Sequence, residues 1–172
     1  MKKIKISVVD TFEQDEAICL KLLKILNLKY EIIWAREIEE ADYVFFSDDG
    51  FSHLSFNSIR IYFSSKDLFP DFNLCDYALG VPSLSWADRY FKLENKIDEE
   101  YEERLKAFLY NIFDQPIYKA ERKDKFMFMK MYEILIRKSS INKNANDILE
   151  LNLEKDLEKL KYYSNILEQS KI

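Results

Sequence analysis

The stretch IYFSSKDLFPDFNLCDYALG, residues 61–80, sets the expectation for the fold of this chain. It contains two short apolar segments, each about the length of a β-strand, with a polar loop between them. Lys66 and Asp67 stand in that loop, shortly after the first apolar segment. In sheets of parallel strands, ligands bind beyond the carboxyl ends of the strands, and this loop is expected to lie there. The loop is therefore the first candidate for a functional site.

Further strand-like segments lie upstream, and a helix-like segment separates the first two of them. Residues 15–27 place Ile18, Leu22, Ile25 and Leu26 on one face of a helix. Five strands are predicted, over residues 4–9, 30–34, 42–47, 59–64 and 75–81. Alternating strands and helices with short connections are typical of a parallel sheet covered by helices. We therefore predict an α/β fold with a Rossmann-like three-layer parallel sheet.

The second half of the chain is predicted to be helical. Residues 97–113, 125–138 and 149–167 carry apolar side chains at helical spacing, and in the last of these segments leucines recur every three or four residues. The last segment is expected either to fold back on its own domain or to associate with another copy. No linker separates the two halves. We predict an α/β domain over residues 1–93 and a helical extension over residues 94–172 that packs on it.

The composition excludes several classes of function. The chain has only two glycines, Gly50 and Gly80. A dinucleotide-binding fingerprint needs three glycines within six positions, and a P-loop needs two together with Lys-Ser/Thr. The formal net charge of -5 argues against non-specific binding to phosphate backbones. We therefore predict no cofactor and no nucleic-acid partner.

The residue types that bind metals or act as nucleophiles are sparse. Cys19 and Cys75 lie far apart in apolar segments, which predicts buried free thiols. His53 is the one histidine, so a zinc site has almost no ligand set and no Ser/His or Cys/His pair can be argued. Asp48 and Asp49 are adjacent carboxylates, but a hard cation needs about six oxygen ligands. A tight turn is the better interpretation of that pair, and no metal site is predicted.

No targeting or membrane-spanning segment is expected from the sequence. The chain starts with basic residues, but the apolar run that follows is too short for a signal peptide and ends at Asp10. No stretch reaches the roughly 18 apolar residues that a membrane span requires. We therefore expect a cytoplasmic protein without a membrane span.

Residues 59–93, IRIYFSSKDLFPDFNLCDYALGVPSLSWADRYFKL, resemble the alpha-1,3-fucosyltransferase family of bacteria. The resemblance is carried by PDFNLCDYALG at residues 70–80 and by DRY at residues 88–90. The upstream segments IKISVVD, YEI and ADYVFFSDDG are collinear with the family, so the resemblance covers residues 4–93, about half of the chain. It implies the N-terminal, acceptor-binding half of a GT-B-type enzyme, in which a second Rossmann-like domain binds GDP-fucose and fucose is transferred with inversion.

The sequence departs from the family pattern in two places. The Gly-Tyr-Val-Thr-Glu-Lys run of the family's donor-binding half does not occur. In the loop before PDFNLCDY, the family reads Tyr-Thr-Gly-Glu-Asn, and the resemblance assigns the general base to this Glu. Aligned without gaps, the matching residues are Phe63, Ser64, Ser65, Lys66 and Asp67, so lysine stands at the position of the base.

A lysine at this position changes the chemistry that the loop can perform. A carboxylate is ionised at neutral pH and accepts the proton of the acceptor hydroxyl, whereas an ammonium group with a reference pKa of ~10.4 does not unless burial lowers that pKa. Asp67 is adjacent, but neighbouring side chains of an extended chain point to opposite sides. We therefore predict no catalytic residue in this chain, with Asp67 as the alternative base.

Two main hypotheses of function follow. In the first, the chain is a fucosyltransferase-like acceptor-half domain, non-catalytic alone, that binds a glycan or a partner protein. The candidate binding residues are Asp10, Lys66, Asp67, Asn73 and Arg89. Arg89 is also interpreted as a structural anchor, and Asn73 is expected to hold its loop to the sheet through bonds to the backbone.

In the second hypothesis, the chain is half of a split or truncated alpha-1,3-fucosyltransferase that transfers fucose from GDP-fucose to a glycan acceptor. Its partner would be a separate chain that carries the donor domain. A structural or assembly protein that reuses the fold is a third possibility, with the leucine-rich face of residues 149–167 as its contact surface.

Overall fold

A computed structural model describes residues 1–35, 37, 40–85, 88–94, 98–117, 161, 162 and 165 of the chain. The expected helical segments over residues 125–138 and 149–167 lie outside the described residues, apart from those three isolated positions. The described elements are, in chain order, β1 (Lys2–Val9), η1 (Glu13–Asp15), α1 (Glu16–Asn27), β2 (Tyr30–Trp34), β3 (Tyr43–Phe46), η3 (Ser52–Ser55), β4 (Ile59–Phe63), β5 (Tyr77–Gly80), β6 (Tyr90–Lys92) and α2 (Glu99–Asp114).

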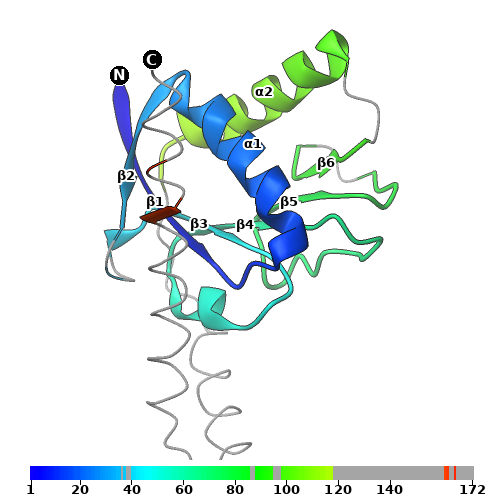
Figure 1. Cartoon of the computed structure of the whole chain (residues 1–172), viewed down its shortest axis with the longest axis horizontal. Helices are drawn as coiled ribbons and strands as arrows, with labels where there is room; N and C mark the ends of the chain where they lie inside the picture. Colours follow the sequence, from blue (N-terminus) through cyan, green and yellow to red (C-terminus); the bar gives the residue numbers. More distant parts are fainter. Residues whose placement is uncertain are drawn as a thin grey trace, which may run out of the picture.

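The strands form one six-stranded sheet in the order β2-β1-β3-β4-β5-β6, and every neighbouring pair is parallel (Figure 1). The predicted Rossmann-like α/β fold is therefore confirmed. All five predicted strands occur, and the sequence missed β6. That strand has only three residues, which is too short to show an alternating pattern.

The strand order reverses direction at β1. Ile6 of β1 pairs with Trp34 of β2 on one side and with Tyr43 of β3 on the other. The chain thus starts in the interior of the sheet, builds β2 outward on one side, and then returns to build β3 to β6 on the other. In open parallel sheets, such a switch point leaves a crevice beyond the carboxyl ends of the two strands that flank it. The ends of β1 and β3 are therefore the expected position of a site.

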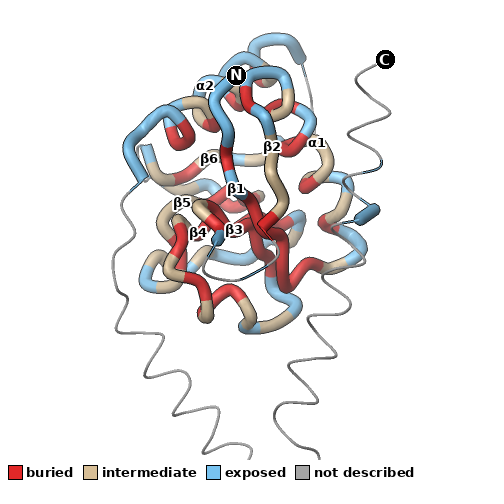
Figure 2. Tube along the Cα trace, turned by 90° about the vertical axis from the view of Figure 1, so that its left-hand side faces the viewer, coloured by how far each residue is buried: buried red, intermediate tan, exposed pale blue. Residues whose placement is uncertain are grey.

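The two faces of the sheet have separate cores. Alternate strand residues, such as Ile4, Ile6 and Val8 of β1, join the buried faces of α1 and α2 in one cluster. The other strand residues, such as Val9, Val44 and Phe46, form a second cluster with side chains from loops. The central strands are the most buried part of the described chain (Figure 2). Within the described residues, both long helices therefore cover the same face.

Helix α2 is capped at its N-terminal end and hydrogen-bonded to the sheet region at its C-terminal end. The carboxylate of Asp98 accepts a hydrogen bond from the backbone N–H of Tyr101 at 2.9 Å, which caps the first turn. At the other end, Asp114 accepts hydrogen bonds from Lys29 Nζ at 2.6 Å and from Tyr30 Oη at 2.8 Å. These two hydrogen bonds, Lys29 first, lower the pKa of Asp114. The predicted helix over residues 97–113 thus packs directly on the sheet.

Aromatic rings make the central contact between α2 and the sheet. The ring of Phe113, which is fully buried, lies 4.1 Å from that of Tyr43 and 6.2 Å from that of Phe45, centroid to centroid. Cys19 and Cys75 are both buried, and no disulfide joins them, as predicted. No helix in the described part of the chain has the length and apolarity to cross a bilayer.

Replacing Phe113 with alanine tests whether α2 belongs to the folding unit. We expect Phe113→Ala to lower the free energy of unfolding by about 3–5 kcal/mol, because it leaves a cavity against two strands. Urea denaturation followed by circular dichroism measures this loss. Leu28→Ala, at a side chain that is 70% exposed, is the control and should change stability by less than about 0.5 kcal/mol. Equal, small effects of both substitutions would show that α2 docks only loosely.

Candidate functional site

The buried carboxylate of Asp15 connects the segments that follow three strands. Asp15, in η1 shortly after β1, has no exposed surface. Its Oδ2 accepts a hydrogen bond from Ser47 Oγ at 2.6 Å, just beyond β3. Its Oδ1 accepts from the backbone N–H and the hydroxyl of Ser65, at 2.8 and 2.7 Å, beyond β4. The segments that follow β1, β3 and β4 therefore meet through Asp15.

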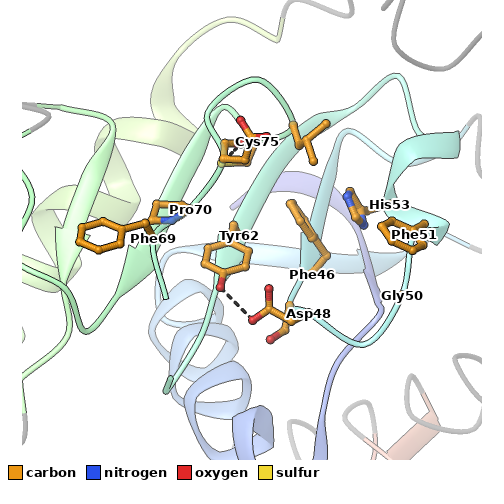
Figure 3. Close-up of a pocket in the computed structure, with 12 residues that line it drawn as sticks. Phe46, Asp48, Gly50, Phe51, His53, Tyr62, Phe69, Pro70 and Cys75 are labelled. Atoms are coloured by element: carbon orange, nitrogen blue, oxygen red, sulfur yellow. Dashed lines mark hydrogen bonds between the residues drawn. The ribbon is translucent and has the colours of Figure 1, made fainter. Parts of the chain in front are cut away.

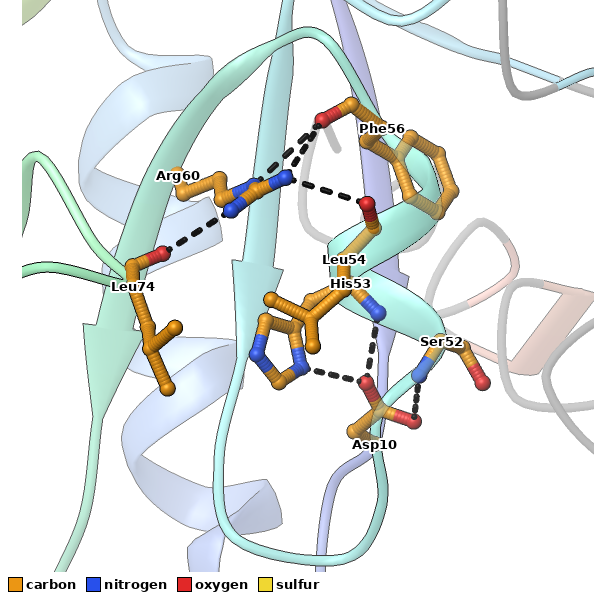
Figure 4. A network of polar contacts seen from close by, with 7 residues as sticks. All are labelled: Asp10, Ser52, His53, Leu54, Phe56, Arg60 and Leu74. Carbon is orange, nitrogen blue, oxygen red and sulfur yellow. Dashed lines mark hydrogen bonds and ion pairs between the residues drawn. The ribbon is translucent and has the colours of Figure 1, made fainter. Parts of the chain in front are cut away.

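Asp10 holds the segment that follows β3. It is buried and has a positive φ of 53°, which turns the chain sharply at the end of β1. Its carboxylate accepts hydrogen bonds from the backbone N–H of Ser52 at 3.0 Å and of His53 at 2.7 Å, which holds the start of η3 (Figure 4). Its carbonyl accepts from the N–H groups of Ser47 and Asp49. Asp10 thus fixes the loop after β3.

His53 is paired with Asp10, a partner that its sequence neighbourhood did not predict. The Nδ1 atom of its ring lies 2.8 Å from Oδ2 of Asp10, and both side chains are only 4% exposed. The ring stacks on that of Phe46, with centroids 3.8 Å apart and planes inclined by 11°. Its other nitrogen, Nε2, is buried and has no hydrogen-bond partner in the described structure. Because Asp10 and His53 are 43 residues apart, no local pattern could have revealed the pair.

A pocket of about 340 Å³ opens beyond the ends of β3 and β4 (Figure 3). One wall comes from the loop that follows β3 and from η3, and the other comes from Tyr62 and the loop between β4 and β5. The lining consists of Phe46, Ser47, Asp48, Gly50, Phe51, His53, Tyr62, Phe69, Pro70, Asp71, Leu74 and Cys75. Two of these rings are largely exposed, Phe51 at 58% and Phe69 at 71%.

Asp48 is the acidic group held between the two walls. Its Oδ2 accepts a hydrogen bond from the hydroxyl of Tyr62 at 2.9 Å and a longer one from Ser64 Oγ at 3.3 Å. Burial raises the pKa of Tyr62, and the hydrogen bond to Asp48 raises it further, so the phenol keeps its proton throughout the neutral range. Asp48 therefore forms a hydrogen-bonded link between the segment after β3 and strand β4. Among the described residues, no group of three or more His, Cys, Asp or Glu side chains is placed to hold a metal ion.

Lys66 and Asp67 lie near the pocket but do not line it. The ammonium group of Lys66 sits 3.6 Å from the ring centroid of Phe12, a cation–π contact with the segment after β1. Its backbone N–H donates to Ser64 Oγ at 3.2 Å. Asp67 is exposed. The loop thus turns its lysine towards η1 and leaves its aspartate in solvent.

Asn73 does not hold its loop to the sheet in the expected way. It is exposed, and its side-chain amide donates to the carboxylate of Asp71 at 2.8 Å, two residues away. The backbone N–H of Asn73 donates to the same oxygen at 2.9 Å, so the two residues build a local turn. Asn73 therefore shapes the loop, and other residues attach it.

Two arginines attach this loop to the sheet. Arg89 donates to the carbonyl oxygens of Asp76 at 2.8 Å and Cys75 at 3.1 Å, which makes it an anchor of the loop. Arg60 is fully buried, and its guanidinium donates to the carbonyls of Leu54 in η3, of Phe56 just after η3, and of Leu74 in the β4–β5 loop (Figure 4). Sequence reasoning missed Arg60, because an arginine within a short strand gives no sign that it is buried.

The all-parallel sheet with a pocket beyond its strand ends defines the chain as a Rossmann-like domain. The family model for the alpha-(1,3)-fucosyltransferase FucT N-terminal domain matches residues 6–96. The chain therefore belongs to this family, and the resemblance found in residues 4–93 is confirmed. A search of curated proteins found no significant match.

Solved structures of alpha1,3-fucosyltransferase are similar to the chain over part of its length. A structure with GDP is 28% identical, with a TM-score of 0.42, and the match covers 62% of this chain and 29% of the other. A second is 24% identical, with a TM-score of 0.44 and coverage of 73% and 37%. A third, with GDP-fucose, is 28% identical, with a TM-score of 0.41 and coverage of 54% and 27%. The match thus spans well under half the length of each solved protein.

Gly50 is the residue on which the wall of the pocket depends most directly. Its φ is +154°, and a Cβ atom at this position would lie 2.6 Å from Oδ1 of Asp10. We expect Gly50→Ala to lower the free energy of unfolding by about 2 kcal/mol, because the methyl group displaces the carboxylate that holds η3. Chemical denaturation measures the loss.

Gly80→Ala is the matched control for this substitution. Its Cβ would meet the hydroxyl of Tyr90 at 3.1 Å, the far end of a side chain, and its backbone is not in the left-handed region. We expect a clearly smaller loss of stability. If the two variants were equally stable, the contact between Gly50 and Asp10 would not be a constraint on the fold.

Proposed function

We propose that this chain is a glycan-binding domain of the fucosyltransferase N-terminal type, without transfer activity of its own. Membership of the family supports a role in recognising saccharides. We place the glycan-binding site in the pocket beyond β3 and β4. This pocket lies at the carboxyl edge of the sheet, next to the switch point between β1 and β3, where ligands of such sheets bind.

The combination of exposed rings and carboxylates in one pocket is the observation that carries this proposal. Phe51 and Phe69 offer apolar ring faces to a ligand at the rim, while Asp48 and Asp71 offer oxygen acceptors. A sugar ring has C–H groups that pack on an aromatic face and hydroxyl groups that donate to carboxylates. An exposed aromatic ring with no ligand costs free energy of hydration, which a stacked sugar would recover.

The position of Lys66 supports the absence of catalysis. Where the family pattern has the carboxylate that removes a proton, this chain has a cation packed on Phe12. An ammonium group has no lone pair with which to accept a proton. The loop can therefore position a ligand but lacks the base at that residue.

A second candidate function is half of a split alpha-1,3-fucosyltransferase. The exposure of Asp67, one residue from the position of the base, favours it. A separate donor-domain chain would then bring GDP-fucose to the same edge of the sheet, and Asp67 would accept the proton of the acceptor hydroxyl. A protein partner would in that case cover the exposed surface of Leu68 and Phe69, which are 45% and 71% exposed.

Removing the ring of Phe69 tests the glycan-binding proposal. We expect Phe69→Ala to weaken binding to the best glycan on an array by about tenfold, because a stacked ring contributes roughly 1–1.5 kcal/mol. Titration calorimetry with that glycan measures the affinity. Leu68→Ala is the control, since Leu68 is exposed but does not line the pocket. Array binding that is absent, or unchanged by Phe69→Ala, contradicts the proposal.

Thermal melting with GDP-fucose separates the two candidate functions. A ligand that binds only the folded state stabilises it by about 2.7 kcal/mol when its concentration is 100 times its dissociation constant. The melting temperature then rises. We expect no shift for this chain alone and no transfer of fucose to a glycan. Transfer that requires a second chain and disappears in Asp67→Asn would establish the split enzyme instead. Lys66→Glu is a companion variant that asks whether a carboxylate at that position restores activity.

A further inference from the structure

The ring nitrogen Nε2 of His53 is an unused hydrogen-bonding group in the wall of the pocket. The other nitrogen of the ring, Nδ1, lies 2.8 Å from a carboxylate oxygen of Asp10. Because a carboxylate accepts hydrogen bonds, Nδ1 is the donor and carries a proton. In the neutral imidazole, Nε2 then carries a lone pair and acts as an acceptor. Figure 4 shows this nitrogen on the side of the ring away from Asp10, towards Leu74, which also lines the pocket. A buried polar atom without a partner costs free energy until a donor reaches it.

The other polar side chains of the pocket are acceptors, or have already donated their protons. The hydroxyl of Ser47 donates to Asp15, and that of Tyr62 donates to Asp48. The thiol of Cys75 donates to the carbonyl of Asp71. The remaining two polar residues of the lining, Asp48 and Asp71, are carboxylates. None of these side chains offers a free donor to an incoming ligand.

We propose that this pocket is selective for the neutral, hydroxyl-rich part of a saccharide, and that Nε2 of His53 accepts a hydrogen bond from one of its hydroxyl groups. The inference rests on the proposed glycan binding and specifies the ligand class. A sugar hydroxyl donates to each acceptor, whereas a carboxylate or phosphate group brings a negative charge to Asp48 and Asp71 without a donor to compensate it. Like charges at a binding surface are strongly unfavourable, so a uronic acid is rejected.

Contact between Nε2 and a ligand requires a side chain of the lining to move. Nε2 is buried, whereas the rings of Phe51 and Phe69, which line the same pocket, are largely exposed (Figure 3). Exposed side chains change rotamer within nanoseconds, so a ring can turn aside and a hydroxyl can enter. Stacking of His53 on Phe46 and its bond to Asp10 keep the imidazole fixed while this happens. The acceptor is thus pre-oriented before the ligand arrives.

Because His53 is the only histidine of the chain, its imidazole nitrogens can be observed directly. Full-length protein labelled with ¹⁵N-histidine, with a purification tag that contains no histidine, gives a single ring spectrum. We expect a protonated Nδ1 and an unprotonated Nε2 in the free protein. Methyl galactoside and methyl glucoside are the neutral probes, and the matching methyl galacturonoside and glucuronoside are the anionic ones. At least one neutral probe should shift the Nε2 resonance and bind at least about tenfold more tightly than its anionic counterpart.

Asp48→Asn tests the charge argument with little change of shape, since the amide oxygen still accepts from Tyr62. We expect the preference for the neutral probe to fall by about threefold or more. Glu103→Gln, which removes an exposed carboxylate on α2, is the control for net charge and should leave the preference unchanged.

The possible results separate this inference from the proposed function. A neutral probe could shift the backbone resonances of the pocket without shifting Nε2, or Nε2 could be protonated in the free protein. In either case the proposed role of His53 is wrong, while the proposed glycan binding stands. If uronides bind as well as neutral glycosides, the proposed selectivity is wrong. If neither the probes nor any glycan of the array binds, both proposals fail.

Discussion

The hydrogen bonds that the carboxylate of Asp10 accepts are the constraint on which the site depends. Asp10 stands at the end of β1 with a positive φ, and it holds Ser52 and His53 of a segment that follows β3. Each of these bonds involves a charged acceptor in a buried position, where such bonds are strongest. The close approach of Gly50 to the same carboxylate shows how little space is left around it. The wall of the pocket therefore follows from one turn after the first strand.

Two kinds of acidic group lie at the same edge of the sheet. Asp10 and Asp15 are buried and bind backbone and hydroxyl donors, so they build the site. Asp48 and Asp71 face the pocket, where a ligand can reach them. The ammonium group of Lys66 lies over the ring of Phe12 and contributes to packing. This arrangement keeps the framework of the fucosyltransferase N-terminal domain, with buried carboxylates inside it and exposed carboxylates at the pocket.

Much of the fold was predictable because its signals are local. Five of the six strands and both long helices of the described region follow from apolar spacing, which reflects the alternate burial of residues in strands and helices. The loop that contains Lys66 and Asp67 was also expected to lie beyond the carboxyl ends of the strands. The strand β6, the buried Arg60 and the pairing of Asn73 with Asp71 were missed or misassigned, because each depends on what neighbouring segments place around it.

The sequence by itself determined the class of the fold, the family and the two buried thiols, since all of these are read from residue types and their local order. Only the tertiary structure decided the partners of the buried polar groups. The pairing of Asp10 with His53 spans 43 residues, and that of Asp15 with Ser65 spans 50. Such contacts arise when parallel strands bring their carboxyl ends to one edge, and no short stretch of sequence records which side chains will meet there.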